Sequence, residues 1–597
     1  MGYAAACERV FAMPELLGLV CTHLTRRQLL RLLTVSRNFH DTFLPVFYDQ
    51  VNLQHYSTLR FSARWLISSA PLIRKITLSD EFLNVYSKAV VAYNERTTSD
   101  GDKDYHSMQV IPLPPMERLS GLTYAPSMTT RLLLTHKEER YRIIGMNFMR
   151  LCWAIELSPL LTQLSVGELF LSSRHEPGVF ARVIGGLVHL RELKLKVQCD
   201  EELWEKVVVG IARHCPPMMQ GIQLGCNLQQ CSYSNALVLA QLDKIDKDEA
   251  LLPMPQEPLL QLTKLDLESS PHYIPRSICR LLERCPELIT LHPPPANNAL
   301  NQTIIATCVA QHCPKLRRIY RQQPRWIHRR QGNLEECGST TFGTIVNVVP
   351  RNTLQQLLIG ENTRNDAHLC SMIPAHYESL ISIKFPKCRA LDRPTILGIL
   401  RNCEALEVFE VQSWDDDLWE VSISLEEAGE DPWASNRIRV LELAIDVGED
   451  IKFVGRWPPE EPSARYSERV MMQLERFFRQ IGAQHRLTNL CLKITDNSKN
   501  FGKKCGHYSL FSFWSMLRLG KRTSDPSPFK VKQMGHLQLL SNLSELRTLT
   551  GSFDFRSLYR DNAITSIELD WYRKHWPRYQ NNDLRNLEVL AKFNWRY

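Results

Sequence analysis

A short apolar phrase recurs along most of this 597-residue chain and constrains its fold more than any other feature. In each copy three apolar residues are spaced as apolar–x–x–apolar–x–apolar, and a helical stretch precedes the phrase. The start-to-start spacing is 29 residues from Leu161 to Leu190 and 26 residues from Leu380 to Leu406. A period of about 20 to 29 residues is typical of stacked strand-and-helix units. Clear copies begin at Ile73, Leu161, Leu190, Met219, Leu262, Leu354, Leu380, Leu406, Ile438 and Leu487, and looser copies begin at Leu288 and Leu316.

A cysteine marks the register of several copies. Cys285 and Cys313 each stand three residues before the first leucine of a phrase and are followed by proline, and Cys403 takes the same place. No single unit can bury its leucines alone, so neighbouring units must stack to form a continuous core. We therefore predict an α/β solenoid with short parallel strands inside, helices outside, and the cysteines packed beneath the turns. The pattern resembles the cysteine-containing leucine-rich repeats that are common in F-box proteins.

The first fifty residues have a different, all-helical pattern. Pro14 suits the first turn of a helix, because the N–H that proline lacks would have no partner there. Leu16, Val20 and Leu24 follow at intervals of four residues, which is the spacing of one helix face. We expect an amphipathic helix that begins at Pro14.

Two more short helices are expected to follow. Thr25 and Gln28 predict a capping box at the start of the second. Phe39 and Phe43 predict the third, which should end at Pro45. Three short helices bury too little surface to make a complete core. Some of the leucines should therefore remain exposed until a partner or the next domain covers them.

This segment resembles an F-box, the docking module of substrate adaptors in ubiquitin ligases. Met13-Pro14-Glu15-Leu16-Leu17 matches the family's opening Leu-Pro-x-Glu-Leu-Leu, with methionine replacing the first leucine. Val35-Ser36-Arg37 matches its Val-Ser/Cys-Lys/Arg, and Phe39 and Phe47 stand at or near the positions of two family tryptophans. The resemblance is to a divergent, fungal-like member of the F-box/leucine-rich-repeat proteins. It implies that a Skp-type linker, itself bound to a cullin–RING scaffold, docks on Pro14, Leu16, Leu17, Val20, Leu24, Leu29, Leu32, Val35, Phe39 and Phe47.

The domain prediction follows from these patterns. Residues 1–52 form the F-box-like helical module, residues 53–115 form a linker and the first repeat, and residues 116–597 form the leucine-rich-repeat solenoid. Stretched repeats predict insertions, which in such folds lie in loops and often carry recognition. They are expected near 241–258, 412–433, 446–467 and 497–529.

Composition narrows the class of protein. The sequence contains no apolar run long enough to cross a membrane and no signal-peptide pattern, and its 17 cysteines indicate reduced thiols in the cytoplasm, the nucleus or both. A net charge of +8 over this length is mild, and the strand positions carry mixed signs. Neither feature is typical of a nucleic-acid surface, so we expect no nucleic-acid or membrane partner.

Two charged runs are candidates for substrate contact. The first extends from Lys315 to Arg330 without an acidic residue. Its arginines suit the carboxylate or phosphate groups of a substrate, and we name Arg317, Arg318, Tyr320 and Arg321 as candidate residues. The alternative is a solvated loop. The second run, from Asp415 to Asp431, is acidic and contains Trp419, with Trp414 and Trp433 just outside it. It is a partner of the basic run, a site for a basic substrate, or a solvated insertion.

No catalytic or metal-binding pattern accompanies these features. The sequence contains no phosphate-binding loop, no H-E-x-x-H, no G-x-S-x-G and no paired C-x₂-C, so no enzyme activity, cofactor or metal is expected. We expect a non-catalytic substrate-recognition adaptor of an SCF-type ubiquitin ligase, which binds an unknown protein substrate through its repeats. The alternative is a leucine-rich-repeat scaffold with no ubiquitin role, in which the N-terminal helices only cap the repeat array.

Overall fold

The protein is described from a computed structural model, in which the chain divides into two compact units. Unit 1 comprises Met1–Asn297 and Gln311–Lys315, and unit 2 comprises Asn298–Ala310 and Leu316–Tyr597. The structure describes Leu66 and residues 13–21, 23–53, 68–83, 85–86, 114, 116–125, 137–171, 173–228, 257–269, 275–294, 299–321, 341–359, 367–386, 391–412, 422–446, 468–495, 535–551 and 566–579.

Unit 1 begins with a three-helix module: α2 (Pro14–Cys21), α3 (Arg26–Leu32) and α4 (Arg37–Asp49). The start of α2 at Pro14 confirms the expected helix, and the Thr25–Gln28 capping box is present. Inside the module, Leu17, Cys21, Leu29 and Phe43 form a small buried core. Four residues supply little apolar area, which agrees with the expectation that so short a module encloses an incomplete core.

Helix α4 is longer than predicted, because Pro45 lies inside it instead of ending it. A proline within a helix removes one main-chain hydrogen bond, which ordinarily favours a break. Here the residues that follow it, Val46 and Phe47, pack against the core of the module, and this packing favours continuation of the helix. The expected stop at Pro45 is therefore wrong. The helix ends at Asp49, immediately before the first strand.

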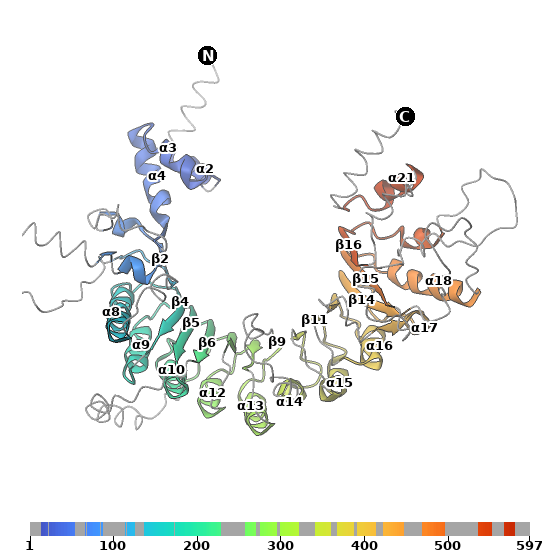
Figure 1. The fold of residues 1–597 in the computed structure, drawn as a ribbon. Helices are drawn as coiled ribbons and strands as arrows, with labels where there is room; N and C mark the ends of the chain where they lie inside the picture. Colours follow the sequence, from blue (N-terminus) through green and yellow to red (C-terminus); the bar gives the residue numbers. More distant parts are fainter. Residues whose placement is uncertain are drawn as a thin grey trace, which may run out of the picture. The chain divides into compact units, whose positions relative to one another are not determined.

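Eight parallel strands of unit 1 follow one another in chain order, with helices packed outside them (Figure 1). Each strand from β1 to β7 pairs with the next. The strands are β1 (Gln50–Asn52), β2 (Lys75–Leu78), β3 (Gly121–Tyr124), β4 (Gln163–Phe170), β5 (Glu192–Cys199), β6 (Gly221–Leu228), β7 (Lys264–Ser269) and β8 (Thr290–His292). The helices are η1 (Ala70–Leu72), α8 (Lys137–Glu156), α9 (Glu176–Gly185), α10 (Glu201–His214) and α12 (Pro275–Leu282).

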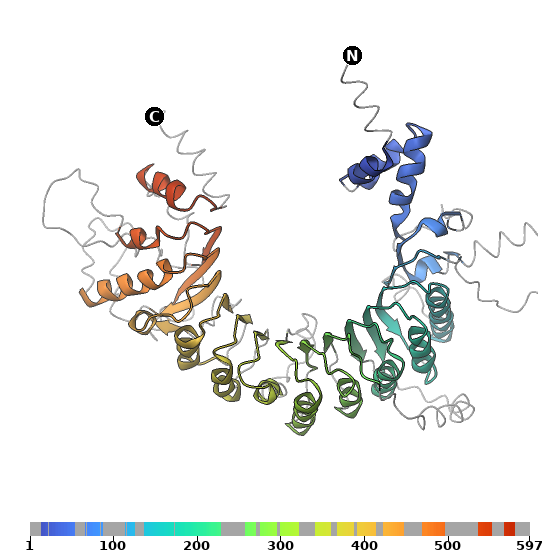
Figure 2. The ribbon, with the colours of Figure 1, turned by 180° about the vertical axis from the view of Figure 1, so that it is seen from behind.

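Unit 2 repeats this arrangement, as Figure 2 shows from behind. Its strands are β9 (Arg318–Arg321), β10 (Gln356–Ile359), β11 (Ser382–Pro386), β12 (Val408–Gln412), β13 (Ile423–Ser424), β14 (Val440–Asp446), β15 (Asn489–Thr495) and β16 (Thr548–Gly551). The helices are α13 (Ala299–His312), which reaches the boundary of the unit, α14 (Thr341–Val348), α15 (Ala367–Met372), η4 (Ile373–His376), α16 (Arg393–Asn402), α17 (Leu425–Glu430), α18 (Glu468–Gly482), η5 (Gly535–Leu540) and α21 (Ser566–His575).

The core of each unit lies between the strands and the helices. Along β2 to β7, β10 to β12, β14 and β15 the apolar positions of the repeat phrase are buried, and they align in register between neighbours, as Ile76, Leu122 and Leu164 do. The register cysteines Cys285 and Cys403 are also buried, as expected. The α/β leucine-rich-repeat fold that the phrase predicted is therefore confirmed.

The repeat phrase did not predict all of the strands. At β3 the phrase positions are Leu119, just before the strand, and Leu122 and Tyr124 within it. The search for aliphatic residues did not recognise this copy, because its last position is a tyrosine. Strand β1 belongs to the sheet even though it was predicted as the tail of the helical module. The predicted segment 53–115 is described only in part, and residue 114 is its one described residue beyond residue 86. The predicted insertions at 446–467 and 497–529 lie almost wholly outside the described residues, as does most of that at 241–258. The predicted domain boundaries remain predictions.

Candidate partner-binding surfaces

The three-helix module exposes large apolar side chains that its own core does not use. Six residues of the module have exposed fractions from 37% (Leu16) to 63% (Leu19): Met13, Leu16, Leu19, Val20, Leu30 and Val35. We call these six residues the N-terminal apolar surface. Exposed apolar side chains gathered in one short segment are typical of a surface that binds another protein.

The ten predicted docking residues fall into separate groups in the structure. Leu16, Val20 and Val35 are exposed. Leu17 and Leu29 are buried in the core of the module, while Leu24, Leu32, Phe39 and Phe47 pack against that core and are partly buried. Pro14 begins α2. Sequence reasoning did not name Leu30, whose neighbour Leu29 is buried because adjacent residues on a helix face different directions.

The same module also exposes four arginines. Arg26, Arg27, Arg31 and Arg37 are all exposed on or beside α3. The guanidinium of Arg26 lies 4.8 Å from the centre of the Phe47 ring, which places a cation over an aromatic face. Arg37 lies 3.9 Å from Asp41, a distance that makes only a weak surface ion pair. The module therefore exposes both apolar side chains and arginines.

The module joins the repeats without an intervening linker. Helix α4 ends at Asp49, and β1 begins at the next residue and pairs in parallel with β2. The main-chain N–H of Arg74 donates to the oxygen of Asp49 at 3.2 Å, and the side chains of these two residues form an ion pair at 3.7 Å. These contacts fix the direction of α4 relative to the first strands.

A groove of about 510 Å³ lies on the inner face of the first five strands, from β1 to β5. We call it the β1–β5 groove. Residues between the buried phrase positions line it, including Lys75, Thr77, Thr123, Ser165 and Lys194. A volume in the range of about 300 to 1,000 Å³ is usual for sites that hold small ligands or short segments. Sequence reasoning did not bring these five residues together.

The predicted basic site is only partly described. Arg317 and Arg318 are exposed in unit 2, and the Tyr320 hydroxyl bonds to the side-chain oxygen of Gln356. Burial raises the pKa of Tyr320. Arg321 ends β9 in register with Ile359, and its side chain lies outside the described part of the chain, as does the rest of the run up to Arg330. The role of these four residues in substrate binding remains a prediction.

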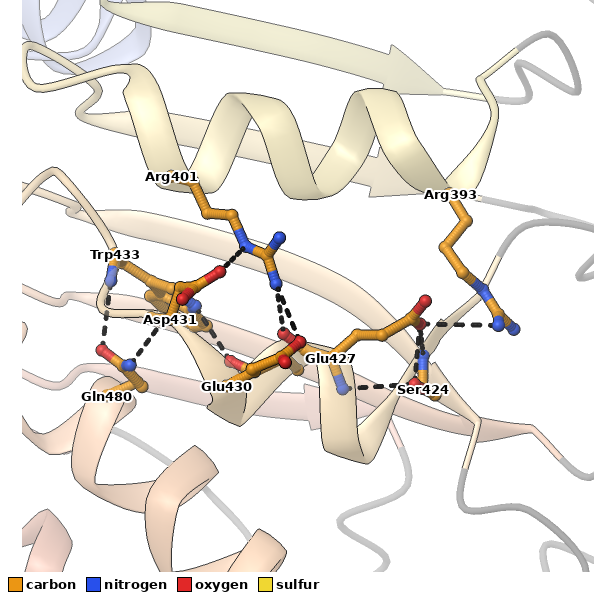
Figure 3. A network of polar contacts seen from close by, with 9 residues as sticks. Arg393, Arg401, Ser424, Glu427, Glu430, Asp431, Trp433 and Gln480 are labelled. Atoms are coloured by element: carbon orange, nitrogen blue, oxygen red, sulfur yellow. Dashed lines mark hydrogen bonds and ion pairs between the residues drawn. The ribbon is translucent and has the colours of Figure 1, made fainter.

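Three described acidic residues of the second charged run pair with arginines of α16 (Figure 3), and a fourth, Glu426, pairs with Arg469 of α18. The Nε of Arg401 lies 3.1 Å from the Asp431 carboxylate, and its Nη2 lies 3.6 Å from that of Glu430. Arg393 lies 3.4 Å from the carboxylate of Glu427. These acids therefore hold α17 against α16. The start of the run, from Asp415 to Asp417, lies outside the described residues.

Further contacts in Figure 3 join the same segment to α18. The Gln480 side chain donates to the main-chain oxygen of Asp431 at 2.8 Å and accepts from the Trp433 main-chain N–H at 3.2 Å. The indole of Trp433 donates to the oxygen of Ala428 at 3.2 Å. The network has a structural role, because each of these groups has its partner within unit 2.

The structure and the repeat pattern together define an α/β repeat protein of the leucine-rich type. None of the described helices has the length and apolar character needed to span a membrane. Comparisons with protein-family models and with curated proteins found no match. Among solved structures, the chain is similar to the crystal structure of the Rad7 and Elc1 complex in yeast. Sequence identity is 14%, the match covers 76% of this chain and 88% of that chain, and the TM-score is 0.28. A TM-score this low does not define a shared fold, so the class rests on this chain's own strands and repeats.

Proposed function

We propose that this protein is the substrate-recognition adaptor of an SCF-type ubiquitin ligase. The N-terminal module docks a Skp-type linker, and the inner face of the repeats binds the substrate. The observation that carries the proposal is the N-terminal apolar surface, which lies in the segment whose sequence resembles an F-box. An isolated cap would gain stability by burying these side chains, whereas a docking module needs them exposed.

In this role the chain positions the substrate and performs no chemistry. A ligase adaptor raises the effective concentration of a substrate lysine near the ubiquitin carrier. The direct passage from α4 into β1 supports that role, because a short, fastened junction limits the orientations of the substrate relative to the linker. The cullin–RING scaffold would supply the catalytic partner.

The same junction also supports a second candidate function. Helix α4 leads into the first strand of the sheet, as the terminal cap of a repeat scaffold would do. A scaffold of this kind would bind proteins through its repeats and would have no role in ubiquitin transfer.

Affinity purification coupled to mass spectrometry distinguishes the two functions. Full-length protein and a variant that lacks residues 1–49 are purified from the same cells. The adaptor function predicts a Skp-type linker and a cullin with the full-length protein and their loss from the deletion variant, with other bound proteins retained. The scaffold function predicts neither subunit in either sample, together with loss of soluble protein upon deletion.

A further inference from the structure

The residues of the β1–β5 groove form a row that crosses all five strands. Strand register aligns Asn52 with Thr77, Thr77 with Thr123, Thr123 with Ser165, and Ser165 with Lys194. Adjacent strands lie about 4.8 Å apart, so the row presents neighbouring side chains at that spacing. Its members are one amide, three hydroxyls and one ammonium, and all of them can donate hydrogen bonds.

A second lysine reaches the groove across a glycine. Lys75 of β2 is in register with Gly121 of β3. A side-chain carbon added to Gly121 would meet the Lys75 Cγ at 3.2 Å and its Cδ at 3.6 Å. The stem of Lys75 therefore lies across the glycine, and Gly121 provides the space that it occupies. Lys75 is therefore the second lysine that lines the groove.

Two other lysines of the inner faces pair with acids, whereas within the described part of the chain the two groove lysines do not. Lys196, two residues beyond Lys194 on β5, pairs with Glu168 at 3.1 Å, and Lys384 in unit 2 pairs with Glu410 at 2.9 Å. No ion pair joins Lys75 or Lys194 to an acid among the described residues. Two lysines without an acidic partner beside hydroxyl donors make a setting that favours an anion.

One carboxylate, Glu192, also lines the groove. It lies on β5 in the neighbouring row, in register with Gln163, and is two residues from Lys194. The charged lining residues are therefore two lysines and one glutamate, which leaves a positive balance. Glu192 would disfavour a second anionic group at the β5 end of the groove, so a single anionic side chain fits better than an acidic cluster.

We propose that the β1–β5 groove binds an extended protein segment through one anionic side chain, a phosphorylated serine or threonine or a carboxylate. Lys75 and Lys194 pair with the anion between β3 and β4, where Thr123 and Ser165 are the nearest hydroxyl donors. Thr77 lies one strand further along the row and hydrogen-bonds the flanking part of the segment. This inference deepens the proposed function by naming a feature of the substrate. It rests on the proposed function only for the fate of the bound segment, because peptide binding to the groove requires no Skp-type linker.

The test uses the full chain and labelled peptide pools that have one fixed central residue and degenerate flanks. The fixed residue is phosphoserine, glutamate or alanine, and binding is measured by fluorescence anisotropy. We expect the phosphoserine pool, the glutamate pool, or both, to bind more tightly than the alanine pool. A charged hydrogen-bonded contact contributes enough that Lys75→Gln or Lys194→Gln should weaken anionic-pool binding about tenfold. Lys194→Arg keeps the positive charge and should therefore retain much of the anionic-pool binding that Lys194→Gln loses.

The matched control is Lys264→Gln, because Lys264 is an exposed lysine on the inner face of β7, outside the groove. This variant should bind the anionic pools as the wild type does. Equal binding of all three pools, or unchanged binding by both glutamine variants, would overturn the proposal. So would inorganic phosphate that binds as tightly as the phosphoserine pool, because this result would indicate a site for a small anion.

Linker binding by the same variants separates this inference from the proposed function. Lys75→Gln and Lys194→Gln lie outside the N-terminal module and should retain the Skp-type linker. Retained linker with no preference for anionic pools would refute the groove inference alone. Preference for anionic pools by a wild-type protein that never binds the linker would refute the ligase role alone.

Discussion

Arg74 fastens Asp49 to the first repeat through both its main chain and its side chain. The main-chain contact is 3.2 Å long and the ion pair 3.7 Å long. An exposed ion pair contributes at most about 1 kcal/mol, so most of the constraint comes from the main-chain hydrogen bond and the pairing of β1 with β2. Helix α4 and the inner face of unit 1 therefore keep a defined relative direction.

A flexible insertion at this junction should uncouple binding from ubiquitin transfer. We expect about six Gly/Ser residues between Asp49 and Gln50 to leave linker and substrate binding intact, because neither surface changes. Transfer to the bound substrate should fall severalfold, because the effective concentration of its lysines decreases. A reconstituted ubiquitination assay measures this, and an unchanged rate would show that the fixed direction has no functional role.

Truncation of two neighbouring leucines of α2 should change the stability of the module by very different amounts. Leu17 is fully buried, so Leu17→Ala should destabilise the module by about 2 to 5 kcal/mol. Leu16 is exposed, so Leu16→Ala should change its stability by no more than about 0.5 kcal/mol. Hydrogen exchange of α2 to α4 measures the local free energy of opening. Similar exchange in both variants would contradict the placement of Leu17 in the core.

The register cysteines should be inert in the folded protein. Burial raises the pKa of Cys313 and of Cys403 to about 12, so both thiols remain protonated at pH 8. We expect iodoacetamide to modify them only after unfolding, as measured by mass spectrometry of digested protein. Cys279 and Cys491 are less buried and serve as internal comparisons. Modification of Cys403 as fast as that of Cys491 would contradict the packing described.

Unit 2 should lose stability in mild acid because of His376. Burial lowers the pKa of this histidine below its ordinary 6.5, although its Nε2 lies 3.4 Å from the oxygen of Val346, which partly opposes the shift. The unfolded chain therefore binds a proton more readily, and stability falls as the pH drops through about 6.5. Thermal unfolding between pH 7.5 and 5.5 should show this loss. His376→Gln should reduce the dependence on pH, and an unchanged dependence would assign it to other groups.

The sequence predicted the parts of the fold that depend on local pattern. The spacing of Leu161, Leu164 and Val166 was sufficient for β4, because buried strand positions repeat in a fixed order. The predicted helix end at Pro45 was wrong, because packing of Val46 and Phe47 outweighs the tendency of proline to break a helix. The repeat phrase did not predict β3, because Tyr124 occupies a position where an aliphatic residue was expected.

The candidate surfaces depended on information that a local pattern lacks. Leu16 and Leu17 are the same residue type, and only the packing of α2 against α4 determines which side chain is exposed and which is buried. The groove needs the register of β1 to β5, which brings Asn52 and Lys194 into one row across long stretches of chain. A search for hydroxyls at the last x of each repeat phrase would have found Thr77 and Ser165.

Binding of a purified Skp-type linker to a variant that places negative charges on the N-terminal apolar surface tests the proposed function most directly. Leu16→Asp with Val20→Asp changes two exposed side chains and leaves the module core intact. Val188→Asp with Leu260→Asp is the matched control, because both residues are exposed apolar residues on the repeats of unit 1. We predict that the first variant loses the linker while the control retains it, with both keeping wild-type thermal unfolding. Wild-type affinity of the Leu16/Val20 variant for the linker would contradict the assignment of this surface as the docking site.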